Sequence, residues 1–116
     1  MRNYRNLMVW GRAHHLTLSI YKSTITFPSE ERFGLTSQTR RSAASIPANL
    51  AEGCGRRSDK EMGRFIQIAM GSGAELSYHL LLARDLHFLD IQTYERLEAD
   101  LGVVMRMMSS LSQRLK

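Results

Sequence analysis

Apolar side chains recur every three or four positions along most of the chain, which is the spacing of one face of an α-helix. No stretch alternates apolar and polar residues in the way that a half-buried strand requires. The pattern predicts four helices, at about residues 5–26, 35–54, 58–87 and 91–115. Because the connections between them are only a few residues long, we expect an all-α, antiparallel up-down-up-down four-helix bundle in a single domain.

Local signals mark the ends of these helices. Phe27-Pro28 stops the first helix, since the residue before a proline disfavours helical backbone. The second ends at Gly53-Cys54-Gly55, where a glycine can take the left-handed cap conformation. The third opens on Ser58-Asp59-Lys60-Glu61, a capping box. In it, the Ser58 hydroxyl accepts a hydrogen bond from the Glu61 amide and the Glu61 carboxylate reaches back.

Pro47 lies inside the second helix, where it cannot donate to the carbonyl of Ala43, so a kink is expected there. Small residues surround it at positions 42–45 and 48. The third helix has a matching patch at residues 71–74, in which each of two glycines gives up about 0.8–1 kcal/mol of helix propensity. A close contact between the two patches would offset that loss, which makes Pro47 and the small residues architectural.

Apolar residues cover more of the third and fourth helices than one buried stripe needs, at positions 80–83, 103–105 and 107–108. This surplus favours self-association through those helices, or through the first helix at positions 7–10. The alternative is that they are single exposed side chains, which ordinary protein surfaces tolerate.

The chain is basic, with a formal net charge of +5 and 16 Lys and Arg, of which 13 are Arg. Guanidinium groups match phosphate and carboxylate oxygens with two hydrogen bonds, so the excess favours nucleic acid or an acidic protein surface as partner. The alternative is a surface that is charged only for solubility.

Six cations belong to the hairpin of the second and third helices, and they are the predicted nucleic-acid-binding residues: Arg40, Arg41, Arg56, Arg57, Lys60 and Arg64. Those near the start of the third helix would lie beside its free amides, an arrangement that suits a phosphate group. Alternatively, Glu52 pairs with Arg56 or with an arginine of the second helix, and the other cations are solvated.

The sequence gives little support for a disulfide, a metal site or a catalytic site. Cys54 is the only cysteine, which excludes an internal disulfide, and no signal peptide or membrane-spanning run is found, so a cytoplasmic protein is expected. His14 and His15 point about 100° apart on a helix, and Glu75 with His79 would offer only two metal ligands. A hydrogen-bonded His79 is the preferred interpretation. We expect no metal, no cofactor and no catalytic residue.

The run from Phe27 to Leu86, FPSEERFGLTSQTRRSAASIPANLAEGCGRRSDKEMGRFIQIAMGSGAELSYHLLLARDL, carries a combination of residues that resembles a known family. Its most specific elements are Phe27-Pro28, Gly34-Leu35, Gln38, Arg41, Ser45-Ile46-Pro47, Asn49, Ala51-Glu52-Gly53, Phe65, Ala69, Gly71-Ser72 and Glu75-Leu76. Leu7, Trp10 and Ala13 fit the opening helix. The family comprises the four-helix-bundle proteins encoded in intervening sequences of bacterial 23S rRNA genes. The retroelement accessory variability protein is more distantly similar.

The resemblance implies a homopentamer with a basic surface, and association with nucleic acid. On this resemblance, Arg41 occupies a position that is usually basic in the family. The predicted structural motif consists of Pro47, Asn49, Glu52, Gly53, Gly71 and Ser72. It brings no catalytic residue. His87 departs from the family pattern, which tends to have glycine there, so the end of the third helix is an open question.

Two functions are thus expected. The first is a non-enzymatic, oligomeric protein that contacts RNA or DNA phosphates through its basic face. The second is an interaction scaffold or accessory subunit that docks a nucleic-acid enzyme such as a reverse transcriptase.

Overall fold

The computed structural model describes residues 2–116, which form four α-helices and two short 3-10 helices. The helices are α1 (Met8–Ser23), α2 (Leu35–Cys54), α3 (Asp59–Asp85) and α4 (Ile91–Arg114). The 3-10 helices are η1 (Tyr4–Asn6), before α1, and η2 (Ser29–Glu31), between α1 and α2. None of these residues forms a strand. The prediction of an all-α fold with four helices is confirmed.

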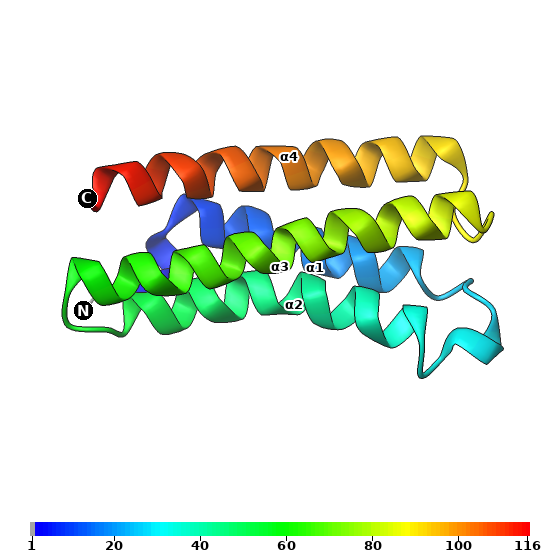
Figure 1. Cartoon of the computed structure of the whole chain (residues 1–116), viewed down its shortest axis with the longest axis horizontal. Coiled ribbons are helices and arrows are strands. Elements are labelled where there is room, and N and C mark those ends of the chain that lie inside the picture. The colour runs from blue at the N-terminus through cyan, green and yellow to red at the C-terminus, as the bar shows by residue number, and fades with distance from the viewer. Residues whose placement is uncertain (1) are drawn as a thin grey trace.

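The helices lie side by side along the long axis of the molecule, which extends 43 Å (Figure 1). α2 packs against α1 and α3, and α4 packs against α3 and α1. The chain changes direction between successive helices, as the colours in Figure 1 show. One end of the molecule therefore holds both termini and the α2–α3 turn, and the other end holds the α1–α2 and α3–α4 connections.

α1 is shorter at both ends than the predicted range of 5–26. Leu7 has extended backbone, with φ −85° and ψ 117°, and separates η1 from α1. At the other end the hydroxyl of Thr24 donates to the carbonyl of Ile20 at 2.8 Å, and regular helix stops at Ser23. Phe27, just beyond, is buried against Phe88 with the ring centroids 5.6 Å apart.

The left-handed glycine expected at the end of α2 is not found. Gly55 caps the helix with φ −82°, and among residues 2–116 no glycine has a positive φ. The left-handed position belongs instead to His87, after α3, with φ 64°. Its amide donates to the Arg84 carbonyl at 3.0 Å, and the Phe88 amide donates to the Ala83 carbonyl at 2.8 Å. These two bonds define a Schellman motif with histidine in the place that glycine usually takes.

The capping box at the start of α3 forms with one change. The Glu61 amide donates to the Ser58 hydroxyl oxygen at 3.1 Å, as predicted. The Glu61 carboxylate accepts a hydrogen bond from the Ser58 hydroxyl at 3.2 Å instead of one from the backbone.

α2 continues through Pro47 without a break in its helical assignment. The carbonyl of Ala43, which loses its usual partner to the proline ring, accepts a hydrogen bond from the Thr17 hydroxyl of α1 at 3.2 Å. A side chain of the neighbouring helix therefore replaces the missing backbone donor.

α2 and α3 lie close together at their shared end. A Cβ atom added to Gly53 would stand 3.1 Å from the Cβ of Phe65. Further along, the hydroxyls of Ser45 and Ser72 are 2.8 Å apart. These contacts agree with the expected close approach of the two helices.

The glycines of α3 do not contribute to that approach, contrary to the prediction for residues 71–74. Gly73 faces α4, where an added Cβ would meet Met105 and Leu101. Gly71 faces outward, and an added Cβ would meet nothing within 4 Å. Only Ser72 of this patch reaches across to α2.

Most of the surplus apolar residues of α3 and α4 pack into or against the core of the chain itself. Leu80, Ala83, Val104 and Met108 are buried, and Leu82, Met105 and Met107 pack partly buried against the core. Leu81 and Val103 are half-buried, and self-association through these helices stays a prediction. The large apolar side chains that are exposed lie elsewhere, at Met8, Leu18, Tyr21, Ile25, Phe33, Ile68, Tyr78, Leu86 and Ile91.

Candidate nucleic-acid interface

The excess positive charge of the protein gathers at the end that holds the termini, which we call the basic end. It contains eight basic residues: Arg2, Arg5, Arg56, Arg57, Lys60, Arg64, Arg114 and Lys116. It contains three acidic residues, Glu52, Asp59 and Glu61. The difference of five equals the formal net charge of +5, and the other eight basic and eight acidic residues balance.

Two of the three carboxylates at this end are engaged in ion pairs. Asp59 accepts from Arg2 at 3.0 Å, and Glu52 lies 3.6 Å from Arg56, whose guanidinium also stands 4.6 Å from the centroid of Phe65. Among residues 2–116, no carboxylate lies within ion-pair distance of Arg57, Lys60 or Arg64, and all three side chains are exposed. These three cations are available to an outside anion.

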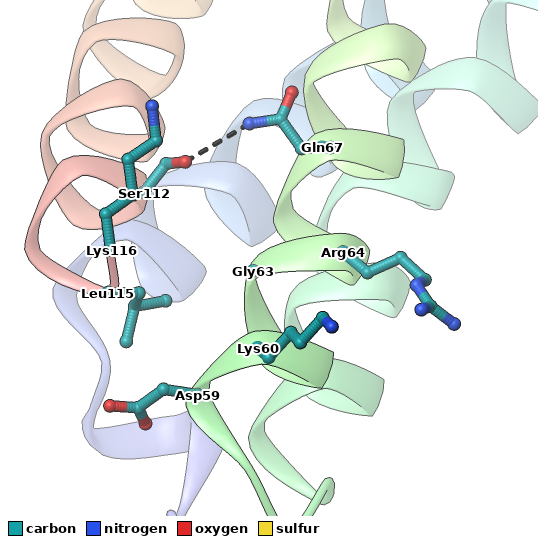
Figure 2. Close-up of a pocket in the computed structure, with 8 residues that line it drawn as sticks. All are labelled: Asp59, Lys60, Gly63, Arg64, Gln67, Ser112, Leu115 and Lys116. Atoms are coloured by element: carbon teal, nitrogen blue, oxygen red, sulfur yellow. Dashed lines mark hydrogen bonds between the residues drawn. The ribbon is translucent and has the colours of Figure 1, made fainter.

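A cleft of about 380 Å³ opens between the first turns of α3 and the last turn of α4 (Figure 2). Gly63 lies in its wall, and the amide of Gln67 donates to the Ser112 hydroxyl at 3.1 Å across it. Figure 2 shows Lys60 and Arg64 extending outward on the side of α3 away from α4, while Lys116 lies along α4. The cations thus flank the cleft and do not converge on one point, an arrangement suited to several phosphates of a strand.

The N-terminus of α3 is not the open phosphate site that the sequence suggested. The Glu61 amide is occupied by the Ser58 hydroxyl, and the Met62 amide donates to the Ser58 carbonyl at 3.0 Å. The carboxylates of Asp59 and Glu61 stand in the same turn, where they already interact favourably with the helix dipole. An added anion would meet these negative charges.

Arg40 and Arg41 do not belong to the basic end, so the six predicted residues do not form one cluster. Arg41 precedes Arg56 by 15 residues, about 22 Å along a helix at 1.5 Å per residue. Arg40 is held against the far end of α1, where it donates to the Thr24 hydroxyl at 2.8 Å and to the Tyr21 carbonyl at 3.2 Å. Its role is to join α1 to α2. Arg41 is exposed nearby.

Arg2, Arg5, Arg114 and Lys116 were missed as members of the charged surface. They are far from residues 56–64 in sequence, and no local motif links them. The available signal was topological, because alternating helix directions bring the start of α1, the α2–α3 turn and the end of α4 to one end of a bundle.

The polar residues of the predicted architectural motif make contacts within α2 and the turn after it, and Ser72 of α3 contacts α2. The Asn49 amide donates to the carbonyl and the hydroxyl oxygen of Ser45 at 2.8 and 3.0 Å, and Ser45 contacts Ser72. Pro47 is buried in α2, and Glu52 pairs with Arg56. These contacts are made within the fold, and the structural role of Pro47, Asn49, Glu52 and Ser72 stays a prediction.

A second polar site that the sequence did not predict lies between α2 and α3, beside Arg41. The Ser42 hydroxyl is 3.2 Å from His79 Nδ1, and His79 Nε2 is 3.6 Å from a carboxylate oxygen of Glu75. Ser42 and His79 are buried, and Ser42 and Glu75 line a polar cleft of about 490 Å³. The prediction of a hydrogen-bonded His79 is confirmed.

This serine, histidine and glutamate series does not provide the other parts of a hydrolytic site. Acyl transfer needs donors directed at a developing oxyanion. Ser42 lies in the interior of α2, where the surrounding backbone amides are used in helical hydrogen bonds. The Ser42 hydroxyl itself is 3.1 Å from the Thr39 carbonyl. The group is best described as a polar contact that joins the two helices.

Within residues 2–116, no group of three His, Cys, Asp or Glu side chains is arranged to hold a metal ion, and no helix is long and apolar enough to cross a membrane. Cys54 is buried, and burial raises the pKa of its thiol, an effect that Arg2 partly opposes. A thiol in this position is a packing residue.

Comparisons with known proteins agree with the family that the sequence resembles. The model of a family described as 23S rRNA-intervening sequence protein matches residues 5–110. A solved structure from Bacteroides thetaiotaomicron, described as a protein of unknown function from the S23 ribosomal protein family, has a TM-score of 0.79. It is 23% identical, and the match covers 88% of this chain and 95% of that chain, which supports a common fold. Comparison with curated proteins gives no match.

Proposed function

The chain belongs to the 23S rRNA-intervening sequence protein family, and from this premise we propose that it is a non-enzymatic cytoplasmic protein that binds nucleic-acid phosphates through its basic end. The observation that carries this proposal is the concentration of the whole charge excess at that end. Arg57, Lys60 and Arg64 extend from it without carboxylate partners among residues 2–116.

Such a surface favours contacts with the nucleic-acid backbone. Lys and Arg on an exposed surface neutralise phosphates and release condensed counterions, which gives affinity without much sequence selectivity. The aromatic residues near the basic end support the same view. Phe65 is covered by Arg56, and Tyr4 packs against Trp10 with 4.9 Å between ring centroids, so neither is presented as a stacking platform for bases.

Fluorescence anisotropy with a labelled structured RNA and a labelled DNA duplex, over a series of salt concentrations, tests the proposal. We expect binding that weakens steeply with salt, with a slope of log affinity against log salt near −0.9 for each phosphate neutralised on duplex DNA. The triple variant Arg57→Glu/Lys60→Glu/Arg64→Glu should reduce affinity by at least tenfold and flatten the slope.

The matched control changes the net charge by the same amount at the other end, with Arg32→Glu/Arg41→Glu/Arg96→Glu. It should keep most of the affinity, because these residues lie away from the basic end. Equal loss in both variants would mean that only net charge matters. Absence of salt-dependent binding by the wild-type protein would exclude the proposed function.

We also propose that the four helices form an up-down-up-down bundle and that the protein assembles as a homopentamer. The order of helix contacts supports the bundle, and the exposure of large apolar side chains such as Met8 and Ile68 supports self-association. The number of five copies is what the family resemblance implies. Light scattering coupled to size exclusion would then give about 66 kDa, five times the 13.3 kDa of one chain. A mass of one chain at all concentrations would contradict it.

A second candidate function is an accessory or scaffold role, in which the protein docks a nucleic-acid enzyme such as a reverse transcriptase. The observation that favours it is a mixed apolar and basic surface away from the basic end. There Phe33 is 87% exposed, with the Arg32 guanidinium 5.4 Å from its ring centroid, and both line a shallow pocket with Arg41. Affinity purification after nuclease treatment tests this role. A stoichiometric protein partner that Phe33→Ser abolishes would support it, and capture of nucleic acid alone would oppose it.

A further inference from the structure

The polar cleft of about 490 Å³ between α2 and α3 takes no part in the proposed nucleic-acid interface. Both helices line it, with Gln38, Arg41, Ser42 and Ser45 from α2 and Ser72 and Glu75 from α3. Its volume falls in the range of small-molecule sites, about 300–1,000 Å³. Most such sites are lined mainly by apolar side chains, whereas every residue that lines this one is polar or charged. The cleft therefore suits a hydrophilic ligand.

One wall of the cleft is fixed by a buried contact between the two helices. Ser42 is 5% exposed, and its hydroxyl lies 3.2 Å from Nδ1 of His79, which is 6% exposed. Nε2 of the same ring lies 3.6 Å from Oε2 of Glu75. His79 thus contacts a lining residue from each helix, which favours a cleft that is formed before a ligand binds.

The middle of the cleft offers hydrogen-bond acceptors. The Ser72 hydroxyl donates to the Ile68 carbonyl at 3.3 Å, so the hydrogen shared at 2.8 Å with Ser45 comes from Ser45. The Ser45 oxygen also accepts from the Asn49 amide at 3.0 Å. A hydroxyl oxygen has two lone pairs, so both serines keep one for a ligand. The Glu75 carboxylate, 61% exposed, is a further acceptor. The ligand must therefore bring several donor groups.

The α2 side of the cleft offers hydrogen-bond donors and a positive charge. Arg41 is exposed, and among residues 2–116 no carboxylate lies within ion-pair distance of its guanidinium, Glu75 included. Gln38, about one turn before Arg41, adds an exposed side-chain amide. A guanidinium binds phosphate or carboxylate oxygens with two parallel hydrogen bonds. The ligand therefore carries an anionic group as well as its donors.

We propose that this cleft binds a phosphorylated sugar, with the phosphate on Arg41 and the sugar hydroxyls on the acceptors of the cleft. A simple anion would leave those acceptors unused and would be repelled by Glu75. A neutral sugar would leave the charge of Arg41 without a partner.

An amino acid fits less well than a sugar phosphate. It has one ammonium group, whereas the acceptors lie on two helices, and Ser72 and Glu75 alone are about 4.5 Å apart along the axis of α3. Several hydroxyl groups on one ring can reach acceptors that are spread in this way. The inference does not depend on the proposed function, because Arg41 lies outside the basic end.

Titration with ribose 5-phosphate, followed by NMR of the backbone amides, tests the proposal. We expect saturable shifts around the cleft, at Ser42, Ser45 and Ser72. Ribose alone and inorganic phosphate alone should each bind about tenfold more weakly, because each lacks one set of hydrogen bonds. Absence of saturable shifts, shifts confined to residues 56–64, or tighter binding of L-serine would overturn the assignment.

Two variants distinguish this site from a general attraction for anions. Arg41→Gln should weaken ribose 5-phosphate binding by about tenfold, because it removes the charge that meets the phosphate. Glu75→Ala should also weaken ribose 5-phosphate binding, because it removes acceptors of the sugar hydroxyls. It should nevertheless strengthen the binding of inorganic phosphate, since a negative charge is lost. A variant Glu75→Ala that bound both ligands more tightly would exclude recognition of the hydroxyl groups.

The matched controls are Arg96→Gln and Glu95→Ala, which make the same changes at exposed positions of α4. Both should leave the two affinities unchanged, and circular dichroism establishes that all four variants keep their helices. A loss in Arg96→Gln equal to that in Arg41→Gln would mean that only net charge matters, and would overturn the proposal. Failure of the protein to bind nucleic acid would exclude the proposed function and leave this titration unaffected.

Discussion

His87 is the one non-glycine residue among positions 2–116 whose backbone is left-handed, with φ 64°. An L-amino acid with a Cβ is disfavoured there by about 1–2 kcal/mol, because the Cβ crowds the neighbouring carbonyl. The hydrogen bonds of the Arg84 and Ala83 carbonyls and the burial of Leu89 just beyond hold the turn in place. The sequence identified position 87 as unusual, and the backbone explains why.

The substitution His87→Gly should raise the free energy of unfolding by about 0.5–1 kcal/mol, since relief of the left-handed strain outweighs the entropy that glycine adds to the unfolded chain. Urea denaturation followed by circular dichroism measures the change. His87→Val serves as the opposing variant and should lower the stability. If glycine proved destabilising, the histidine side chain would have a contact that outweighs the strain.

Asp90 caps α4, and its carboxylate accepts a hydrogen bond from the Thr93 amide at 2.7 Å, which lowers its pKa below the ordinary value. Because the folded-state pKa is the lower one, this carboxylate stabilises the fold above the unfolded-state pKa. The contribution disappears as the pH falls through the folded-state pKa.

The variant Asp90→Ala should therefore unfold at a lower temperature than the wild type near neutral pH, and the difference should shrink as the pH falls through the folded-state pKa of Asp90. Thermal unfolding at several pH values gives the measurement. Gln92→Ala, at an exposed uncharged position of α4, is the control and should show no comparable pH dependence. A difference that is independent of pH would mean that the charge of Asp90 is unimportant.

At the scale of the element, α2 continues through a proline because α1 provides a replacement donor. The Thr17 hydroxyl lies 3.2 Å from the Ala43 carbonyl and 2.8 Å from the Ala13 carbonyl, and all three groups are buried. A buried carbonyl without a partner costs about 1–3 kcal/mol. Thr17 therefore stabilises α2 and ties it to α1 at the same point.

A double-mutant cycle tests this replacement. Thr17→Val should destabilise the wild type by about 1–3 kcal/mol, and clearly less in a Pro47→Ala background, where the amide of residue 47 can again donate to Ala43. Chemical denaturation of the four proteins gives the coupling energy. Thr39→Val, which removes a similar hydroxyl bond to the Leu35 carbonyl, is the control and should be additive with Pro47→Ala.

The elements themselves were largely predictable, because they depend on periodicity and on local caps. The range of α2 was predicted correctly, and Ser58 was recognised as the cap of α3. What could not be predicted was the direction of single residues in space. Gly71 and Gly73 are two positions apart and therefore point about 160° apart around the helix, one to solvent and one to Met105. Residues that are close in sequence, and are therefore predicted to form one patch, can thus face different surroundings.

For the whole molecule, the important feature is the separation of charge between the two ends. Eight cations and three carboxylates share the basic end, and such crowding of like charge is unfavourable until anions bind. An anion that binds the folded protein more strongly than the unfolded chain raises its stability by mass action.

Inorganic tripolyphosphate should consequently raise the melting temperature of the wild type at low salt. The increase should be largely lost in Arg57→Glu/Lys60→Glu/Arg64→Glu and kept in Arg32→Glu/Arg41→Glu/Arg96→Glu. Thermal unfolding by circular dichroism at fixed ionic strength provides the measurement. Equal increases in all three proteins would indicate a general salt effect in place of binding at the basic end.

The candidate site could be predicted only in part, because distance along the sequence does not determine which residues lie close in space. Arg56, Arg57, Lys60 and Arg64 are neighbours in sequence and remain neighbours in space. Arg40 and Arg41 were grouped with them because they share a hairpin, but α2 carries them to the opposite end. Arg2 and Lys116 join the site from the two termini. Helix length and chain direction, not sequence distance, decide which charges meet.

The uneven distribution of charge has one more consequence, for the orientation of the molecule. A body 43 Å long with its whole excess of charge at one end has a large electric dipole moment along its axis. Near a negatively charged polymer or a cation-exchange resin, the electric field will orient the protein before contact. The protein will then adsorb through its basic end, with the α1–α2 connector pointing away. If neighbouring copies all point the same way, their dipoles add, and the assembly presents one positive face and one nearly neutral face.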